Sequence, residues 1–521
     1  MLHADVLGER ARLTPGRTAL VFVPTGGRFT YEALDLRAAR LAQAWLARLG
    51  LTRGDRIGLL AQNCPEFIDA FFAAAKSGVI LVPLSTRATT YELTGIVADS
   101  GMRALMYGPG FLEAVTKLRA GAPLETCIAL DPHERSVPED QALSALIDDI
   151  VPGGQPVSID PEHPLCLLYT SGTTGKPKGV IVPHRMVAWN AYNTTVCWQL
   201  REDDVSPVFT PLYHAGGLGA FLLPIFAAGG TIVLHAGFDP GEIWRVIEAE
   251  RCTVALGVPT IYKLLMDDPG FASADLSHVR WLISGGAPLP RHLIDAYQAR
   301  GVAFKQGYGL TEVGVNCFAM SVDESVTRAG SIGKPLMFTR ARLADEHGED
   351  VPVGDVGELW LKGPHVCRGY WNNPEATAQA LDADGWFHTG DLARQDADGF
   401  YYIAGRKKDM IISGGVNIYP AEIEQALAAH PGVADSAVVG IPDDTWGEVS
   451  VAFVVRAPGS PVDAAELSSY LLGVLSRFKV PKSFEFVERL PRTPYGKVVK
   501  DELRARHLDT LADRGAARHE S

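Results

Sequence analysis

The sequence predicts an α/β protein with a large N-terminal domain and a smaller α+β domain at the C-terminal end. Two observations indicate this. Short apolar runs alternate with stretches of helical spacing in the first third of the chain and again between about residues 165 and 289, a pattern typical of parallel sheets with helices on their faces. Beyond about residue 409 a self-contained run of helix and strand patterns follows, which indicates a second domain.

The first third of the chain establishes the alternation. Residues 56–61 and 79–84 are apolar runs suited to buried strands, and residues 65–76 between them carry apolar side chains at helical spacing. Thr89 and Glu92 have the spacing of a capping box, which predicts that another helix begins there. A further short apolar run then follows as the next strand, so strand and helix alternate as a parallel sheet requires.

One uncharged stretch, residues 215–234, is long enough to cross a bilayer. It is rich in glycine, however, and its Gly229-Gly230 pair is followed by the apolar residues 231–234. That order favours a helix, a turn and a buried strand. We therefore expect no integral membrane association.

The C-terminal end begins with a compact charged break at residues 405–409. Helix patterns at residues 421–429 and 464–475 then enclose two strand patterns. We expect one domain over residues 1–404, a hinge at the break, and a second domain over residues 410–521. The last fifteen or so residues are rich in Arg and Ala and predict a frayed tail.

Composition narrows the function classes. The chain has 521 residues, of which 47% are hydrophobic and 21% charged, and this ordinary globular usage excludes disorder as an overall description. Its 48 Lys and Arg against 61 Asp and Glu give a net charge of −13, so we expect no nucleic-acid partner. The seven cysteines are scattered without a Cys-x-x-Cys pair, which fits a reducing compartment and predicts a cytoplasmic location.

The most informative segment is residues 168–180, with the sequence LYTSGTTGKPKGV between two apolar strand-like runs. Its glycines allow close approach of the backbone to an anion, and its hydroxyls and two lysines can surround a polyphosphate. It is not a Walker A loop, because the spacing differs and Lys176 is followed by proline. A polar surface turn is the alternative interpretation, and the rarity of Ser-Gly-Thr-Thr-Gly disfavours it.

Further motifs follow this segment in a fixed order. They are PLYHAGG at 211–217, GGAPL at 285–289, QGYGLTE at 306–312, GEL at 357–359, GYW at 369–371, WFHTGDL at 386–392, GRKKD at 405–409 and PRTPYGK at 491–497. Together they resemble the adenylate-forming superfamily, and within it the acyl- and aryl-CoA synthetases. The resemblance covers about residues 20–505.

The resemblance implies a ligase that converts a carboxylic acid, ATP and CoA into acyl-CoA, AMP and pyrophosphate through an acyl-adenylate, with Mg²⁺ as its metal. It implies that residues 1–404 bind AMP and the acyl group on flavodoxin-like parallel sheets plus a β-barrel-like subdomain. Residues 410–521 would then form a small, mobile catalytic domain that turns about the hinge at residues 405–409.

The resemblance also assigns a nucleotide site. The residues that would bind ATP or AMP are Thr170, Ser171, Gly172, Thr173, Thr174, Gly175, Lys176, Lys178, Gly286, Ala287, Gly307, Tyr308, Asp391 and Arg406. Among them Asp391 would accept hydrogen bonds from the ribose, and Tyr308 would cover the adenine. Thr311 would contact the α-phosphate, while Thr170 and Glu312 would hold Mg²⁺. Considered alone, Asp391 is also a common turn residue, and Glu312 is also typical of a solvated helix start.

Four residues would take part in catalysis by the same resemblance: Lys497, His214, Thr311 and Glu312. The ammonium of Lys497 would bridge the attacking carboxylate and the α-phosphate. An ordinary surface lysine is the alternative, and acetylation would remove its charge. His214 would gate access to the acyl carbon, with a core or capping histidine as the alternative.

The resemblance places the hinge at Lys408 and lets Gly414 and Gly415 pass the thin pantetheine arm of CoA close to the backbone. The segment after His214 has no acid to pair a substrate ammonium and no cation to pair a second carboxylate. We therefore expect an apolar acid, fatty or aromatic. A loader that passes the acyl group to a carrier protein stays open, as does a homodimer.

Two other interpretations have less support. A non-catalytic nucleotide-binding module predicts loss of Lys497, Glu312 or Asp391, and all three are present. Luciferase-like oxidation of the adenylate has no positive support in the sequence.

Overall fold

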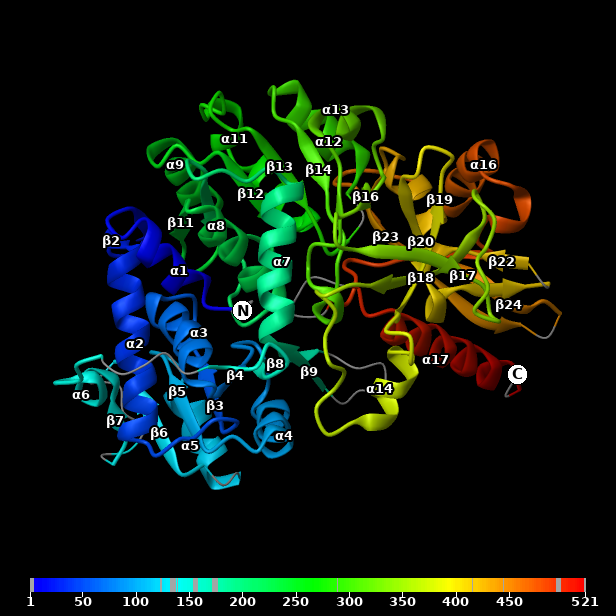
Figure 1. Cartoon of the computed structure of the whole chain (residues 1–521). Coiled ribbons are helices and arrows are strands. Elements are labelled where there is room, and N and C mark those ends of the chain that lie inside the picture. Colours follow the sequence, from blue (N-terminus) through cyan, green and yellow to red (C-terminus); the bar gives the residue numbers. More distant parts are fainter. Residues whose placement is uncertain are drawn as a thin grey trace.

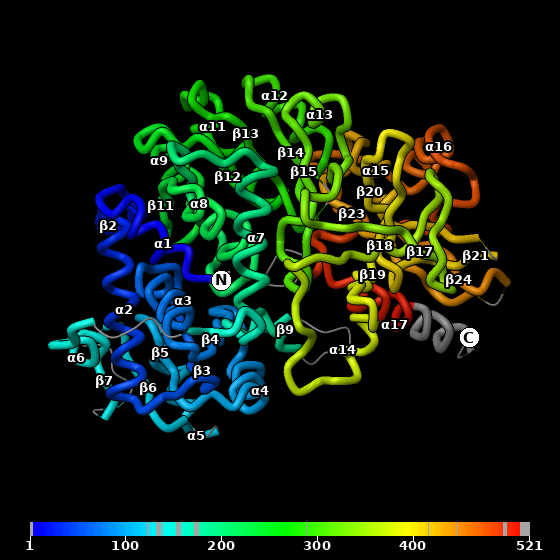
Figure 2. The backbone as a smooth tube through the Cα atoms, in the orientation of Figure 1, coloured from blue at the N-terminus to red at the C-terminus, as the bar shows by residue number. Residues whose placement is uncertain are grey.

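The computed structural model describes residues 4–121, 124–131, 137, 139–152, 158–170, 177–287, 289–414, 416–443, 445–492 and 498–519. The N-terminal part of the chain, from blue to green, lies on one side of the molecule, and the yellow to red C-terminal part lies on the other (Figure 1). The backbone trace places the N-terminal end near the middle of the molecule and α17 in the C-terminal part (Figure 2).

A seven-stranded sheet in the order β7-β6-β5-β3-β4-β8-β9 organises the first part of the chain. Its pairs are parallel except at the end, where β9 runs antiparallel to β8. The strands are β3 (Arg56–Leu60), β4 (Ile80–Pro83), β5 (Ala104–Tyr107), β6 (Thr126–Ala129), β7 (Gln141–Ala142), β8 (Pro164–Thr170) and β9 (Lys178–Pro183). The order confirms the parallel sheet that the sequence predicts.

Helices cover both faces of this sheet because strand side chains alternate between the faces. One core joins α2 and α3 to Ile57 and Leu59, whereas a separate core joins α4 and α5 to Leu60. The helices are α1 (Val6–Leu13), α2 (Tyr31–Ala47), α3 (Pro65–Ser77), α4 (Thr90–Ser100), α5 (Leu112–Gly121) and α6 (Leu143–Ile147). The predicted capping box at Thr89 and Glu92 is present at the start of α4.

Two smaller sheets follow, in the orders β10-β11-β1-β2 and β12-β13-β14. Their strands are β1 (Thr18–Phe22), β2 (Gly27–Thr30), β10 (Val205–Val208), β11 (Thr231–Leu234), β12 (Val254–Gly257), β13 (Trp281–Ser284) and β14 (Phe304–Gln306). The accompanying helices and short pairs are α7 (His184–Cys197), α8 (Leu223–Ala228), α9 (Pro240–Ala249), α10 (Pro259–Asp267), α11 (Gly270–Ser273), α12 (Arg291–Ala299), α13 (Val322–Thr327), β15 (Phe318–Ala319) and β16 (Lys334–Pro335).

The uncharged stretch folds as predicted, with one addition. A π-helical turn η1 (Gly216–Leu222) precedes α8, Gly229 ends that helix at φ +90°, and β11 pairs with β10 and β1. Gly217 has no room for a side chain, since a Cβ there would lie 2.2 Å from the carbonyl oxygen of Pro211. Among the described residues, no helix is both long and apolar enough to span a membrane.

A four-stranded antiparallel sheet, β17-β18-β19-β20, occupies the place of the expected barrel-like subdomain. Its elements are β17 (Arg340–Ala344), β18 (Val356–Lys362), α14 (Pro374–Ala380), β19 (Phe387–Gln395) and β20 (Tyr401–Arg406). Strand β20 continues to Arg406, so the regular backbone ends at the 3₁₀ turn η3 (Lys407–Asp409), inside the expected hinge.

The C-terminal α+β unit has its own sheet, β22-β21-β24-β23, with β25 parallel to β24. Its elements are β21 (Ile411–Ser413), β22 (Val416–Ile418), α15 (Pro420–Ala428), β23 (Val433–Asp443), β24 (Gly447–Arg456), α16 (Ala464–Val474), η4 (Arg477–Lys479), β25 (Ser483–Phe486) and α17 (Lys500–His519). The expected frayed tail is wrong for the backbone, because α17 continues to His519. Asp501 and Glu502 in its first turn favour the helix by opposing the dipole.

Candidate active site

Three predicted nucleotide-binding side chains meet at one edge of the antiparallel sheet. Asp391 lies on β19 directly opposite Arg406 on β20, and the two form an ion pair with 2.5 Å between Oδ1 and Nε. The hydroxyl of Tyr308 donates to the other carboxylate oxygen of Asp391 at 2.5 Å. Asp391 is only 4% exposed, and its contacts with Arg406 and Tyr308 offset the cost of burying a carboxylate.

Burial and the neighbouring charge of Asp391 raise the pKa of Tyr308. Tyr308 is therefore a protonated donor at neutral pH. Its backbone oxygen accepts from the N–H of Cys317 at 3.0 Å, and its ring packs edge-on against Phe318. These contacts fix the aromatic ring of Tyr308 next to the antiparallel sheet.

Thr170 and Lys178 are paired across β8 and β9, at the two ends of the predicted phosphate segment. The ammonium of Lys178 lies 5.2 Å from the centre of the Tyr370 ring, a cation–π distance. The hydroxyl of Tyr370 donates to Oε1 of Glu312 at 3.1 Å. Tyr370 therefore connects the start of β9 to the predicted metal-binding carboxylate.

Backbone pairing holds Tyr370 in this place. The residues around it add to the free edge of β9, since the N–H of Trp371 donates to the carbonyl of Gly179 at 2.7 Å and the N–H of Ile181 donates to that of Gly369 at 2.9 Å. Burial, with the Glu312 carboxylate nearby, raises the pKa of Tyr370, so this phenol also stays protonated. The GYW motif at residues 369–371 did not by itself indicate a role for Tyr370.

Glu312 lies in the 3₁₀ turn η2 (Thr311–Val313), and its backbone oxygen accepts from the N–H of Cys367 at 2.8 Å. In the part of the chain that the structure describes, no three His, Cys, Asp or Glu side chains are grouped as metal ligands. Proteins commonly hold Mg²⁺ through one or two carboxylates together with substrate phosphates. A single carboxylate beside the predicted phosphate segment fits that mode.

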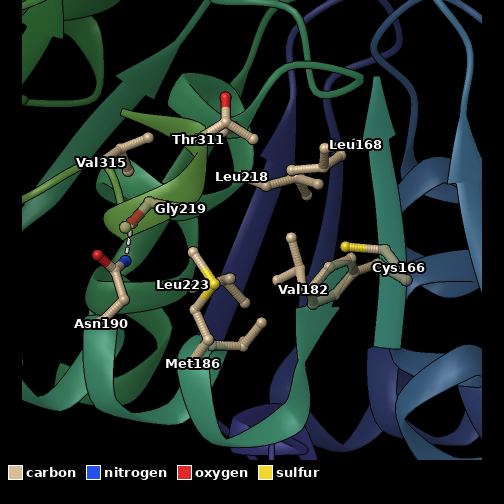
Figure 3. Close-up of a pocket in the computed structure, with 14 residues that line it drawn as sticks. Cys166, Leu168, Val182, Met186, Asn190, Leu218, Gly219, Leu223, Thr311 and Val315 are labelled. Atoms are coloured by element: carbon tan, nitrogen blue, oxygen red, sulfur yellow. Dashed lines mark hydrogen bonds between the residues drawn. The ribbon is translucent and has the colours of Figure 1, made fainter. Parts of the chain in front are cut away.

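Thr311 also lines a cavity in the large domain. Figure 3 shows Thr311 at the top of this cavity and Met186 with Asn190 toward its lower end. The lining residues are Phe71, Cys166, Leu168, Val182, Met186, Val187, Asn190, Ala215, Leu218, Gly219, Leu223, Thr311, Gly314 and Val315. None of these described residues is charged, and we call this cavity the acyl pocket, after the acyl group that the resemblance places in the large domain.

Asn190 is the polar exception at the lower end of the acyl pocket. It comes from α7, where its neighbours Met186 and Val187 share the buried face, and its Nδ2 donates to the carbonyl of Gly219 at 2.7 Å (Figure 3). Asn190 lies in none of the sequence motifs. No local signal distinguishes it, because the buried face of α7 also carries the polar residues Asn193 and Thr194.

The remaining predicted residues of the large domain lie around these clusters. Gly286, with φ +81°, and Ala287 are exposed in the loop after β13, and the N–H of Gly307 donates to the carbonyl of Ser284 in that strand at 2.7 Å. His214 directly precedes Ala215 of the acyl pocket, and its Nδ1 accepts from the N–H of Gly216 at 3.1 Å. Gly307 thus lies beside the strand that leads to Gly286, and His214 adjoins the pocket.

The predicted residues of the hinge and of the small domain lie in exposed turns or outside the described residues. Lys408 is exposed in η3, and next to it Lys407 forms a 2.9 Å ion pair with Glu358 of β18. Gly414 has φ +58° in the turn after β21, and a Cβ there would lie 2.8 Å from the ring of Trp446. Ser171, Gly172, Thr173, Thr174, Gly175, Lys176, Gly415 and Lys497 lie outside the described residues.

Both the large domain and the C-terminal domain of this chain are similar in sequence to known proteins. The AMP-binding enzyme family matches residues 7–371, and the AMP-binding enzyme C-terminal domain matches residues 422–497. Feruloyl-CoA synthase of Amycolatopsis sp. is 44% identical over 500 residues, which are 96% of this chain and 97% of that protein. Indoleacetate–CoA ligase of Aromatoleum aromaticum is 38% identical over 501 residues, again 96% of this chain and 97% of that protein.

Among solved structures, ATP-bound MatB from Rhodopseudomonas palustris has a TM-score of 0.89 with 33% sequence identity. The match covers 98% of this chain and 99% of that one. The similarity therefore extends over the large domain, the antiparallel sheet and the C-terminal unit together.

Proposed function

The chain belongs to the AMP-binding enzyme family as an acid–CoA ligase, and we propose that its substrate is an apolar carboxylic acid, fatty or aromatic. ATP and CoA are its co-substrates, and the acid reacts through an acyl-adenylate, as is characteristic of the family. The observation that carries the choice of acid is the acyl pocket, which begins at Thr311 and has no charged side chain among its described lining residues.

In the first half-reaction a carboxylate oxygen attacks the α-phosphorus of ATP, and pyrophosphate leaves. Thr170, Lys178 and the glycine-rich segment between them would bind the β- and γ-phosphates, with Thr311 at the α-phosphate. Asp391 would accept from the ribose hydroxyls, supported by Arg406. The adenine would lie against Tyr308, beside Gly286, Ala287 and Gly307.

Glu312 and Thr170, with the nucleotide phosphates, would hold Mg²⁺, which supplies positive charge next to the reacting phosphate. Tyr370 would then act as a positioning residue, because its hydroxyl holds Oε1 of Glu312. Lys497 of the C-terminal domain would stabilise the charge that develops between the carboxylate and the α-phosphate. The domain boundary at residues 405–409 belongs to the same proposal.

In the second half-reaction the CoA thiol attacks the acyl carbon and AMP leaves. Rotation of residues 410–521 about Lys408 would withdraw Lys497 and bring Gly414 and Gly415 to the pantetheine arm, with His214 beside the acyl carbon.

All seven cysteines are free, which supports a cytoplasmic location. A homodimer stays a prediction that sedimentation can test.

The test is AMP release with a panel of fatty, aryl and dicarboxylic acids. We expect turnover of one apolar class of acids with CoA. Activity on dicarboxylates should be lower by about 100-fold or more, because the pocket offers a second carboxylate no partner. A phosphopantetheinylated carrier protein replaces CoA in a parallel assay. Activity with the carrier alone would favour the loader, and preference for a dicarboxylate would contradict the proposed acid.

A further inference from the structure

One polar atom in the acyl pocket has no hydrogen-bond partner. Asn190 is 5% exposed, and among the described residues nothing donates to its Oδ1. The orientation of the amide follows from its other end, because Nδ2 donates to the carbonyl of Gly219 at 2.7 Å. If the amide were turned over, its Oδ1 would face the carbonyl oxygen of Gly219, and two acceptors would repel each other. The acceptor, and not the donor, is therefore the end left without a partner.

Other buried asparagines of the large domain show what a structural amide looks like here. Asn63 donates to Thr210 at 3.0 Å and accepts from the N–H of Leu212 at 2.8 Å. Asn193, one turn along α7, uses its Oδ1 for the N–H of Phe338 at 3.3 Å. Both pair their oxygen with the backbone, whereas Asn190 does not.

Two glycines of the pocket wall lie next to the buried Asn190 amide. A Cβ on Gly314 would lie 2.8 Å from Oδ1, and a Cβ on Gly219 would lie 3.6 Å from Nδ2. Both glycines line the acyl pocket. A side chain at position 314 would thus press against the acceptor, whereas glycine leaves only hydrogen there. An unpaired buried acceptor beside the pocket suits a donor that arrives with the ligand.

We propose that Asn190 selects acids that carry a hydrogen-bond donor, a phenolic hydroxyl or a ring N–H, on the part of the molecule remote from the carboxylate. The inference rests on the proposed function and narrows it from apolar acids in general to aromatic acids with a donor. The donor is remote because Thr311, at the predicted α-phosphate, lies at the other end of the pocket from Asn190 (Figure 3). A plain hydrocarbon chain would leave Oδ1 buried and unpaired.

The experiment uses acid pairs of nearly equal shape that differ in one donor. They are 4-hydroxy- and 4-methylcinnamate, 3-hydroxy- and 3-methylcinnamate, and indole-3-acetate and benzofuran-3-acetate. With the wild-type protein we expect kcat/KM for pyrophosphate release to favour the donor member of at least one pair by about 10- to 100-fold. Asn190→Leu should reduce that preference to about 2-fold or less, chiefly through loss on the donor member.

Met186→Leu is the matched control, because it changes an apolar residue of the same pocket and keeps the acceptor. It should shift both members of a pair alike and retain the preference. If Asn190→Leu does not fold, as judged by circular dichroism, Asn190→Ala removes the same acceptor with less crowding. A wild-type protein that turns over these acids without preference, or a variant at position 190 that keeps the full preference, overturns the inference. No turnover of any acid would instead contradict the proposed function itself.

Discussion

On the nucleotide side of the site, Asp391 is paired on both oxygens, by Tyr308 and by Arg406, whereas on the acid side Asn190 leaves its acceptor without a described partner. The nucleotide is the same for every member of the family, so a preformed cluster of charges can serve it. The acid differs between members, and an apolar cavity with one open acceptor can distinguish among acids. In the proposed site, common chemistry and substrate choice would reside in separate groups of side chains, and variants on each side should affect only their own substrate.

The largest loss of activity should come from replacing Lys497, whose proposed place is between the nucleotide and the acid. Lys497→Ala should lower acid-dependent pyrophosphate release by about 1,000-fold or more, because the developing charge loses its counter-charge. Thioester formation from supplied acyl-adenylate should survive. Lys482→Ala, an exposed lysine of the same domain, is the control. Equal loss of both half-reactions would remove Lys497 from its proposed role.

Asp391→Asn tests the nucleotide side. Loss of the carboxylate charge weakens the hydrogen bonds offered to the ribose, so KM for ATP should rise by about 10- to 100-fold while KM for the acid stays within about 2-fold. Steady-state kinetics with each substrate varied in turn give both values. Asp398→Asn, which alters a surface ion pair with Arg328, should change neither. A matching rise in KM for the acid would mean that the two sides are not separate.

Gly219→Val makes the complementary change on the acid side. Its Cβ would lie 3.0 Å from Val315, so the larger side chain should crowd the acyl pocket and raise KM for the acid by about 10-fold. KM for ATP should not change. Gly95→Val is the matched control, since Gly95 is an exposed helical glycine with open space around it. Unaltered acid kinetics in Gly219→Val would show that the acid binds elsewhere.

Tyr370→Phe should have the smallest effect. It removes one hydrogen bond to Glu312, worth about 1 kcal/mol, and leaves the ring beneath Lys178 in place. We expect about a 5-fold rise in the magnesium concentration that gives half-maximal rate, with KM for the acid unchanged. Tyr402→Phe, which loses a bond to Asp396 outside the site, is the control. An unaltered magnesium dependence would leave Tyr370 with a packing role only.

The sequence predicted the parallel sheet because buried strands and amphipathic helices such as β3, α3 and β4 have distinct periods. The nucleotide cluster followed from motifs, since Tyr308, Asp391 and Arg406 lie in recognisable blocks. Periodicity did not indicate the π-helical turn at Gly216–Leu222, which depends on close approach of Gly217 to the backbone of Pro211. The tail was predicted as frayed from its Arg and Ala content, whereas the backbone of α17 continues to His519.

The links between motifs were not predictable for a further reason. Tyr370 reaches Glu312 only because its segment pairs with β9, and Asn190 faces the acyl pocket only because Gly219 and Gly314 stand beside it. Such contacts join residues far apart in sequence, and no local pattern specifies them. Motifs identified the shared chemistry, while packing was needed to see the features that select the acid.

The most direct test of the account is exchange of labelled pyrophosphate into ATP by the purified protein with Mg²⁺ and no CoA. Exchange requires a reversible acyl-adenylate, so it isolates the first half-reaction. The account predicts exchange that depends on an apolar aromatic or fatty acid and that falls to background without the acid. Absence of exchange with every acid of a broad panel would contradict it.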